Sequence, residues 1–228
     1  DESLGFTYLL EGVLRNDSFS QMRFARILLD DKSHYEKNLD IALDVLKKGA
    51  IRGSRKITSF LGLQYLYSDA SLELQLYGKQ LLEKSANEYN CSMAQNILGI
   101  WYNLRKDLNQ SIFYFKRCSI RDAAYQLGLI YLDSDSKLYD VKKGTYYMRI
   151  AAENGVNKAQ WFLSLFYISQ KLTVQALRYL TLASKESSDA SFLLFCLYQA
   201  GIYPQKGCEK SLKFLRYSIE QDNPIALM

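Results

Sequence analysis

The stretch VKKGTYYMRIAAENGVNKAQWFLSLFY, residues 141–167, has the pattern of two amphipathic helices joined by a short turn. Its first segment is basic at the start and ends in the small pair Ala151-Ala152, and a glycine follows in the turn. In its second segment Leu163 precedes Tyr167 by four residues, which places both side chains on one face of a helix. The stretch therefore predicts a helix, a turn and a second helix.

The same landmarks recur along the chain. The pattern Leu-Gly-x-x-Tyr, or a remnant that keeps the leucine and the tyrosine, begins at Leu61, Leu98, Leu127, Leu163 and Leu194. The pair that closes a Lys-rich segment ends at Ala50, Ala86, Ser119, Ala152, Ser184 and Ile219. This pair recurs about every 34 residues, which is the period of a two-helix repeat. Each repeat is therefore predicted to hold a first helix with the leucine and tyrosine, and a second helix that ends at the pair.

Another small residue lies seven positions before each closing pair begins, at Ala42, Gly78, Ser111, Gly144, Ala176 and Ser211. Small side chains let two helix axes approach closely, and a neighbouring leucine or tyrosine fills the groove between them. Glycine inside a helix costs roughly 1 kcal/mol relative to alanine, so its recurrence in the Leu-Gly pattern indicates a packing gain that offsets this cost. We predict that helices of a repeat meet at these small residues.

The composition agrees with a helical core. The chain has 228 residues, 48% of them hydrophobic, which is enough to bury a continuous core and excludes a disordered chain. Only two prolines occur, so an all-α fold is favoured over a turn-rich sandwich. No stretch approaches the roughly 18 consecutive apolar residues of a membrane span. Because the chain begins with Asp1 and not Met, we interpret it as an excised or processed segment.

These residues resemble the Sel-1-like repeats, which are related to the tetratricopeptide repeat. The resemblance rests on the leucine–tyrosine pattern, on the closing pair, and on an alanine that opens the first helix at Ala94, Ala124, Ala159 and Ala190. It implies a right-handed α/α superhelix of about six helix-turn-helix repeats over residues 20–228, expected to continue beyond residue 228 in the full-length protein. Residues 1–19 are too short for a complete repeat and are expected to form a partial repeat or an N-terminal cap.

The resemblance also implies a function. From this resemblance we expect the chain to be a non-catalytic scaffold or adaptor. Its expected partners are proteins, their peptide segments or the subunits of a larger complex. One expectation is an adaptor subunit of the ubiquitin-ligase complex of endoplasmic-reticulum-associated degradation, and an alternative is an activator subunit of another membrane enzyme such as chitin synthase. Membrane contact is expected only through a partner or through a segment outside this chain.

A helical-repeat RNA-binding protein is the alternative of a different class. The net charge of +5 permits an acidic partner, but it is too small to indicate nucleic acid by itself. RNA-reading repeats place polar residues at fixed repeat positions, whereas the position two residues after the opening alanine changes from polar to aromatic along the chain. Nucleic acid is therefore not the expected partner.

Few residues offer catalytic chemistry. His34 is the only histidine, so no second histidine completes a catalytic set, and we interpret it as a solvated loop residue. Metal-ligand motifs and phosphate-binding glycine loops do not occur in the sequence. Cys118 falls at the small position of a second helix and is interpreted as a buried packing residue, with the cysteines reduced. We expect no enzymatic activity, no metal, no cofactor and no small-molecule substrate.

Two groups of residues are candidates for partner binding. Trp161 and Phe192 occupy the repeat position that turns aromatic, and first helices line the concave face of related solenoids. The alternative is that these rings pack against the following repeat. Arg52, Arg55 and Lys56 lie in a predicted turn between repeats and are candidates for gripping an acidic tail, with a merely solvated turn as the alternative.

Three Asn-x-Ser triplets begin at Asn16, Asn90 and Asn109. In a protein of the secretory pathway such triplets accept N-linked glycans when they lie on the surface. They favour the lumen of the endoplasmic reticulum slightly over the cytoplasm as the location, although triplets of this kind also occur by chance.

Overall fold

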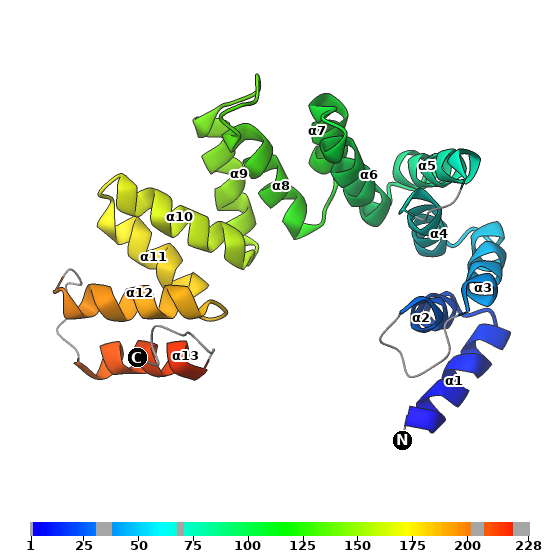
Figure 1. Ribbon diagram of the computed structural model, residues 1–228, viewed down its shortest axis with the longest axis horizontal. Helices are drawn as coiled ribbons and strands as arrows, with labels where there is room; N and C mark the ends of the chain where they lie inside the picture. The colour runs from blue at the N-terminus through cyan, green and yellow to red at the C-terminus, as the bar shows by residue number, and fades with distance from the viewer. Residues whose placement is uncertain (1, 31–37, 68–70, 202–207, 221–228) are drawn as a thin grey trace. The chain divides into compact units, whose positions relative to one another are not determined.

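The computed structural model describes residues 2–30, 38–67, 71–201 and 208–220. Within these ranges the chain forms thirteen α-helices and no strand, so the all-α prediction is confirmed (Figure 1). The leucine–tyrosine patterns fall in helices, and so do the closing pairs, except for Cys118-Ser119, described below, and for Ser184, which is the C-cap of α11.

A single helix, α1 (Glu2–Leu14), precedes six helix pairs. The first helices of the pairs are α2 (Ser18–Leu29), α4 (Arg55–Tyr67), α6 (Ser92–Leu104), α8 (Arg121–Leu132), α10 (Asn157–Ser169) and α12 (Ser188–Gln199). The second helices are α3 (Leu39–Ile51), α5 (Leu72–Asn87), α7 (Leu108–Arg117), α9 (Val141–Glu153), α11 (Thr173–Ala183) and α13 (Cys208–Glu220). In every pair the two helices pack against each other, as the predicted repeat of helix hairpins requires.

The helices group into two compact units. Residues 1–120 hold α1 to α7, and residues 121–228 hold α8 to α13. Within the first unit α3 packs on α4 and α5 packs on α6, and within the second unit α9 packs on α10 and α11 packs on α12. Each hairpin thus contacts the next one inside its unit, which is the architecture of a repeat solenoid.

In the hairpin of α4 and α5, glycines of the two helices face backbone atoms of the opposite helix. A Cβ atom at Gly62 would lie 2.9 Å from the carbonyl oxygen of Gly78. A Cβ atom at Gly78 would lie 2.8 Å from the carbonyl oxygen of Gly62 and 2.9 Å from the backbone nitrogen of Leu66. Backbone atoms cannot move aside as a flexible side chain can, so this hairpin requires glycine at both positions.

In other hairpins the repeat glycine faces a side chain. The space beside Gly99 is filled by the ring of Phe115, and the space beside Gly128 is filled by Met148. The small residues seven positions before the closing pairs are also buried. Ala42 and Ser111 are fully covered, and the Ser111 hydroxyl donates to the Gly99 carbonyl at 2.9 Å. The predicted role of small residues in helix–helix contact is therefore confirmed for the described side chains.

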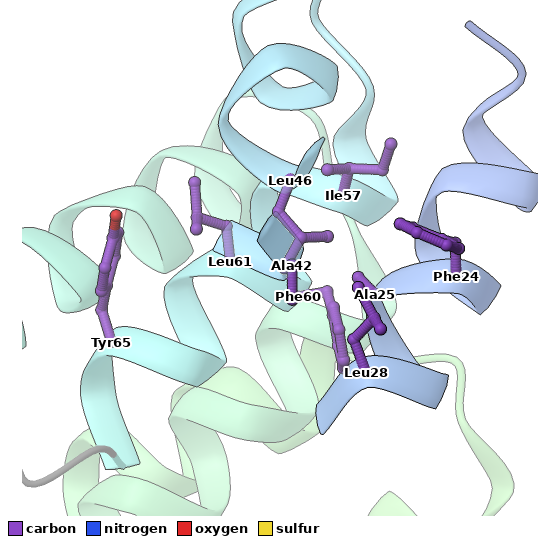
Figure 2. Close-up of a cluster of buried hydrophobic side chains, with 9 residues drawn as sticks. All are labelled: Phe24, Ala25, Leu28, Ala42, Leu46, Ile57, Phe60, Leu61 and Tyr65. Atoms are coloured by element: carbon purple, nitrogen blue, oxygen red, sulfur yellow. The ribbon is translucent and has the colours of Figure 1, made fainter. Parts of the chain in front are cut away.

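One of the two buried clusters that the structure describes in the first unit lies between α2, α3 and α4. Ala42 and Leu46 of α3 are completely buried, and they belong to one cluster with Phe24 of α2 and Ile57 of α4 (Figure 2). Burying an aliphatic side chain of this size contributes roughly 1.5–3 kcal/mol. Because one second helix contributes to the contacts on both sides, the core continues from one hairpin to the next.

Tyrosines of the first helices pack on aromatic rings of the second helices. The stacked pairs, with ring centroids 5.7 to 5.8 Å apart, are Tyr102–Tyr114, Tyr131–Tyr147, Tyr167–Tyr179 and Tyr198–Phe214. Aromatic pairs of this geometry contribute about 0.5–1.5 kcal/mol beyond the area they bury. In these four hairpins the repeated tyrosine packs inside the hairpin, as predicted.

The turns within two hairpins take a left-handed backbone without glycine. Lys106 and Lys171 have φ angles of 62° and 58°, in the region that glycine adopts at no steric cost. Between hairpins, Gly53 and Gly155 take this backbone with φ angles of 83° and 81°, and Asn90 takes it between α5 and α6. Inside these two hairpins, lysine therefore holds a backbone conformation that glycine adopts more readily.

The second helix α7 ends before its closing pair, earlier than predicted. α7 ends at Arg117, so the pair Cys118-Ser119 lies beyond the helix. The Cys118 thiol donates to the carbonyl of Ser92 on α6 at 3.2 Å, and the hydroxyls of Ser119 and Ser92 are 2.6 Å apart. These bonds to the neighbouring helix replace the last helical turn. The interpretation of Cys118 as a fully buried packing residue is therefore wrong, because its side chain is half-buried and hydrogen-bonded.

α1 packs on α2, as a second helix packs on the first helix of the next pair. Its Tyr8 is 64% exposed, and a Cβ atom at Gly5 would meet nothing within 4 Å. Gly5 and Tyr8 are therefore not used for close helix packing. That residues 1–19 serve as a partial repeat or N-terminal cap stays a prediction.

Candidate functional site

Successive second helices of the first unit leave a groove between them. α2 contacts α4 and α4 contacts α6, whereas α3 and α5 have no comparably close approach. The first helices therefore lie on the inner side of this unit, and the second helices spread apart on its outer side. The space between α3 and α5, above α4, has a volume of about 470 Å³. We call it the α3–α5 groove.

The walls of this groove are formed by Lys47, Ala50, Ile51, Tyr77, Leu81 and Lys84. Their spacing of three or four residues on α3 and on α5 places them on one face of each helix. Leu61 and Tyr65 of α4 form the buried floor. On the walls, Ile51 is 85% exposed and Tyr77 is 49% exposed. The groove thus presents apolar surface that the described part of the chain leaves uncovered.

The charges of the groove have one sign. Lys47 and Lys84 stand on opposite walls, and no acidic side chain lines the groove among the residues that the structure describes. Nearby lysines differ, because Lys48 pairs with Asp44 at 2.7 Å and Lys79 pairs with Glu83 at 3.4 Å. Lys47 and Lys84 have no ion pair with any described residue.

The predicted basic turn lies beside this groove. Arg52 is the C-cap of α3 and Arg55 begins α4, and both are exposed, as is Lys56. Arg55 donates from Nη1 to the carbonyl of Tyr89, a groove residue, at 3.3 Å. The structure therefore brings Arg55 to the edge of the groove and leaves Arg52 and Lys56 outside its lining.

The second unit has a groove at the corresponding place, between α9 and α11 and above α10. It has a volume of about 390 Å³, and Gly155 lines it as Gly53 lines the first groove. The charged residues of this α9–α11 groove are Glu153, Arg178, Lys185 and Glu186. Its two acids and two bases balance, in contrast to the α3–α5 groove.

Tyr179 also lines the α9–α11 groove. Burial raises the pKa of its hydroxyl, and the stacked Tyr167 raises that pKa further. The phenol therefore stays protonated at neutral pH and is suited to donate a hydrogen bond. The raised pKa opposes its use as a base.

The predicted aromatic contacts of α10 and α12 are half-buried. Trp161 packs on the buried cluster that includes Leu180 and Leu194 of the following helices. Phe192 has its ring centroid 6.1 Å from that of Phe195 on the same helix. The structure thus shows the packing that was the alternative for Trp161, and it leaves both residues untested as partner contacts.

Basic and polar side chains donate hydrogen bonds to acceptors at the C-terminal ends of second helices. Arg117 donates to the side-chain oxygen of Asn87 at 2.8 Å and to the carbonyl of Ala86 at 3.2 Å. The side-chain amide of Gln95 donates to the same Ala86 carbonyl at 3.3 Å, and that of Gln160 donates to the Ala152 carbonyl at 3.0 Å. Carbonyls at a helix end lack partners within the helix, so these bonds join successive hairpins.

The described cysteines Cys91, Cys118 and Cys196 are free thiols, and the side chain of Cys208 lies outside the described residues. Burial raises the pKa of Cys91, but the hydrogen bond from Ser59 and the backbone N–H groups of α6 outweigh it and lower the pKa overall. Burial raises the pKa of Cys118. Neither thiol lines a groove.

Two of the three Asn-x-Ser triplets have a backbone reason for asparagine. Asn16 and Asn90 have φ angles of 63° and 48°, and asparagine tolerates this left-handed region better than most residues. The side-chain oxygen of Asn90 accepts a hydrogen bond from Gln95 at 2.7 Å. Asn109 is exposed in the first turn of α7. Glycosylation of the three stays a prediction.

His34 lies outside the described residues. Among those that are described, no group of three or more histidine, cysteine, aspartate or glutamate side chains is placed to hold a metal ion. None of the described helices has the length and apolar character that crossing a membrane requires.

The lysines and apolar residues of the α3–α5 groove were not predicted as a site. Lys47 and Lys84 belong to the basic positions before the closing pairs, and the helix macrodipole explains those of them that lie in a last helical turn. The signal for a groove is the combination of Lys47 with Ile51 one turn later, and of Tyr77 with Leu81 and Lys84, on neighbouring second helices. Such a pattern becomes visible only once those helices are placed side by side.

Sequence comparison alone finds no relative, since no protein-family model and no curated protein match the chain. Solved structures do match. A Sel1 repeat protein from Oxalobacter formigenes has a TM-score of 0.59 and 24% identity, over 97% of this chain and 67% of that chain.

Two further structures agree. A protective antigen of uropathogenic Escherichia coli strains with an SLR fold has a TM-score of 0.65 and 19% identity, over 96% of this chain and 49% of that chain. An immunity protein from Pseudomonas aeruginosa has a TM-score of 0.53 and 15% identity, over 89% of this chain and 80% of that chain. The chain therefore has the fold of the Sel1 repeat proteins, and the predicted resemblance is confirmed at the level of the fold.

Proposed function

We propose that this chain is a non-catalytic scaffold that binds segments of partner proteins. The observation that carries the proposal is the α3–α5 groove, which presents exposed Ile51 and Tyr77 between two lysines that have no partner among the described residues. An apolar groove with a few directed polar groups is the usual form of a binding site. The Sel1-type fold supports the proposal because stacked repeats hold such surfaces rigid.

A preformed groove lowers the cost of binding. The walls and floor of the α3–α5 groove come from helices that are fixed by the buried core around Leu46 and Leu61. The scaffold therefore loses little conformational freedom when a partner segment docks, and most of the ordering cost falls on the partner. Lysine, tyrosine and leucine in this arrangement bind a ligand but supply no activated nucleophile.

Trp161 and Phe192 are proposed as a second contact, on the first helices of the second unit. Changing both to alanine is expected to weaken partner capture while the helical content by circular dichroism is kept. Because Trp161 also packs on Leu180 and Leu194, the single Phe192→Ala variant is the cleaner test. Unchanged capture by both variants would remove this contact from the proposal.

A finer assignment rests on fewer observations. An adaptor role in endoplasmic-reticulum-associated degradation is supported only by the triplets at Asn16, Asn90 and Asn109, and an activator role for an enzyme such as chitin synthase has no specific support. Treating the protein from its native cells with an N-glycosidase tests the first assignment. A mobility shift that Asn109→Gln reduces supports the lumenal location, and no shift contradicts it.

Site-specific photo-crosslinking tests the scaffold function. A photoreactive amino acid at Ile51, inside the groove, is compared with one at Val174 on α11, which is 80% exposed and lines neither groove. The expected result is a discrete protein crosslink at Ile51 and none at Val174 in the full-length protein. Crosslinks to RNA at Ile51, or equal crosslinking at the two positions, would overturn the proposal.

A further inference from the structure

We propose that the α3–α5 groove binds an acidic peptide segment that carries a central apolar side chain. This inference rests on the proposed scaffold function and names the chemistry of its partner. The apolar side chain fills the space between Ile51 and Tyr77, and carboxylates on either side of it meet Lys47 and Lys84.

The apolar part of the groove specifies the centre of the segment. Leu61 and Tyr65 close the floor, with exposures of 2% and 5%, so a ligand cannot pass deeper into the unit. Above them Ile51 on one wall is 85% exposed, and Tyr77 on the other wall is 49% exposed, with its ring centroid 6.0 Å from that of Tyr65. Covering such surface with an apolar side chain gains about 25 cal/mol for each Å² removed from water.

The lysines specify the flanks. A lysine near the C-terminus of a helix is often explained by the macrodipole, whose effect falls off within the last turn. That explanation applies to Lys48 and Lys84, which lie in the last turns of α3 and α5. It does not apply to Lys47, which lies one residue earlier and has no acidic partner among the described residues. Lys84 also has no acidic partner among the described residues, and two unpaired charges on opposite walls favour an anionic ligand that spans the groove.

A phosphate backbone fits these observations less well than a peptide does. Nucleic acid binding without sequence preference uses aromatic platforms on which bases stack, whereas most of the repeated tyrosines are stacked inside the hairpins. A sugar-phosphate chain also has no aliphatic side chain to fill the space beside Ile51. An acidic peptide satisfies both the charges and the apolar walls.

The test is fluorescence anisotropy with the full chain and short labelled peptides. The first peptide has a central leucine flanked on both sides by glutamates, the second replaces the leucine with glycine, and the third replaces the glutamates with glutamines. We expect saturable binding of the first peptide that weakens as salt rises. We expect about tenfold weaker binding of the second, a loss of roughly 1.4 kcal/mol, and no detectable binding of the third.

Matched charge variants locate the site. Lys47→Glu combined with Lys84→Glu is expected to weaken binding of the first peptide about tenfold or more. Lys48→Glu combined with Lys158→Glu changes the net charge equally, at exposed positions outside both grooves, and is expected to weaken binding less than about twofold. Circular dichroism of both double variants shows whether they are folded, and Ile51→Asp serves as an independent block of the groove.

Equal loss in the two double variants would overturn the inference, because it would show attraction to overall charge. Binding of the glutamine peptide as tightly as the glutamate peptide, or tighter binding of oligouridine than of either, would also overturn it. If no peptide binds while Ile51 still crosslinks to a protein partner, the acidic segment is wrong and the scaffold function stands. If the Ile51 crosslink is also missing, the scaffold function itself fails.

Discussion

The α3–α5 groove and the α9–α11 groove occupy the same place in the repeat and differ in charge. Each lies between successive second helices, and each is lined by the turn glycine between hairpins, Gly53 or Gly155, with nearly equal φ angles. The first groove carries two lysines and no described acid. The second carries two acids and two bases, with Tyr179 added.

The comparison shows which residues determine shape and which determine chemistry. Small residues, leucines and turn glycines recur because helix packing depends on them, so each repeat forms a groove of similar kind. Residues on the exposed faces of the second helices are free to vary, because no neighbour in the hairpin restricts them. Binding specificity is therefore expected to lie at those exposed positions and not in the repeated landmarks.

The largest effect on stability is expected when the close helix packing beneath one groove is disturbed. Gly62→Ala forces a Cβ atom against the carbonyl of Gly78 and is expected to destabilise the first unit by about 2 kcal/mol. Gly128→Ala, at the same repeat position of the second unit, meets only the flexible Met148. It is expected to change stability by less than about 1 kcal/mol, because alanine also favours the helix.

Urea unfolding followed by tryptophan fluorescence measures this difference. The chain has two tryptophans, Trp101 in the first unit and Trp161 in the second, so variants with Trp161→Phe or Trp101→Phe report each unit by itself. Equal costs for the two alanine variants would show that backbone contact between α4 and α5 is not what requires glycine there.

The next largest effect is expected from changing the charges of the second groove. Glu153→Lys with Glu186→Lys gives the α9–α11 groove a basic lining and is expected to tighten its binding of the acidic leucine peptide about tenfold. The measurement is anisotropy in a background with Lys47→Glu and Lys84→Glu, so that the first groove does not contribute. No gain would mean that the two grooves differ in shape as well as in charge.

Most of the fold was predictable because the residues that pack between helices recur at regular intervals in the sequence. Leu98 and Gly99 are buried as expected, since both must lie where two helices meet. The end of α7 was not predictable, because the side-chain bonds between Ser92, Cys118 and Ser119 join residues of different helices. No local pattern indicates such bonds.

The candidate site was only partly predictable for the same reason. Arg55 was identified from the run of basic residues, and it does lie at the edge of the α3–α5 groove. Lys47, Ile51 and Tyr77 were not identified, because they become neighbours only when α3 and α5 are placed beside α4. Trp161 was predicted as a partner contact from its repeat position, two residues after the opening alanine. In the structure it packs on the next helices.

Replacing the lysines with positive φ is expected to have a smaller effect on stability, of equal size in the two units. Lys106→Gly in the first unit and Lys171→Gly in the second remove an unfavourable left-handed backbone. Each is expected to stabilise its unit by about 0.5 kcal/mol, because the larger entropy of unfolded glycine offsets part of the gain. Urea unfolding of each unit by its tryptophan measures this, and destabilisation by either change would contradict it.

The smallest effect concerns acid pH. The hydrogen bond from Ser20 lowers the pKa of Asp17, the N-cap of α2, and the backbone N–H of Lys143 lowers that of Asp140, the N-cap of α9. A lowered pKa means that the stabilisation is present above the unfolded value of 3.8 and is lost as the pH falls through the lower folded value.

Asp17→Asn and Asp140→Asn keep a capping oxygen but do not titrate. Each is expected to reduce the loss of stability between pH 4 and lower values in its own unit only. Thermal melts at a series of acidic pH values, read by Trp101 or Trp161, check this. If the loss of stability at acidic pH is unchanged in both units, neither N-cap contributes to that loss.

The most direct test compares the two grooves in one spectrum. Gly53 and Gly155 line the α3–α5 and α9–α11 grooves at equivalent turns, so their backbone amides report the occupancy of each groove in a nitrogen–proton correlation spectrum. On titration with the acidic leucine peptide, we expect the Gly53 amide to shift saturably and the Gly155 amide to stay in place. Equal shifts of both amides, or a shift of Gly155 alone, would contradict the claim that one repeated frame carries a groove specific for acidic segments.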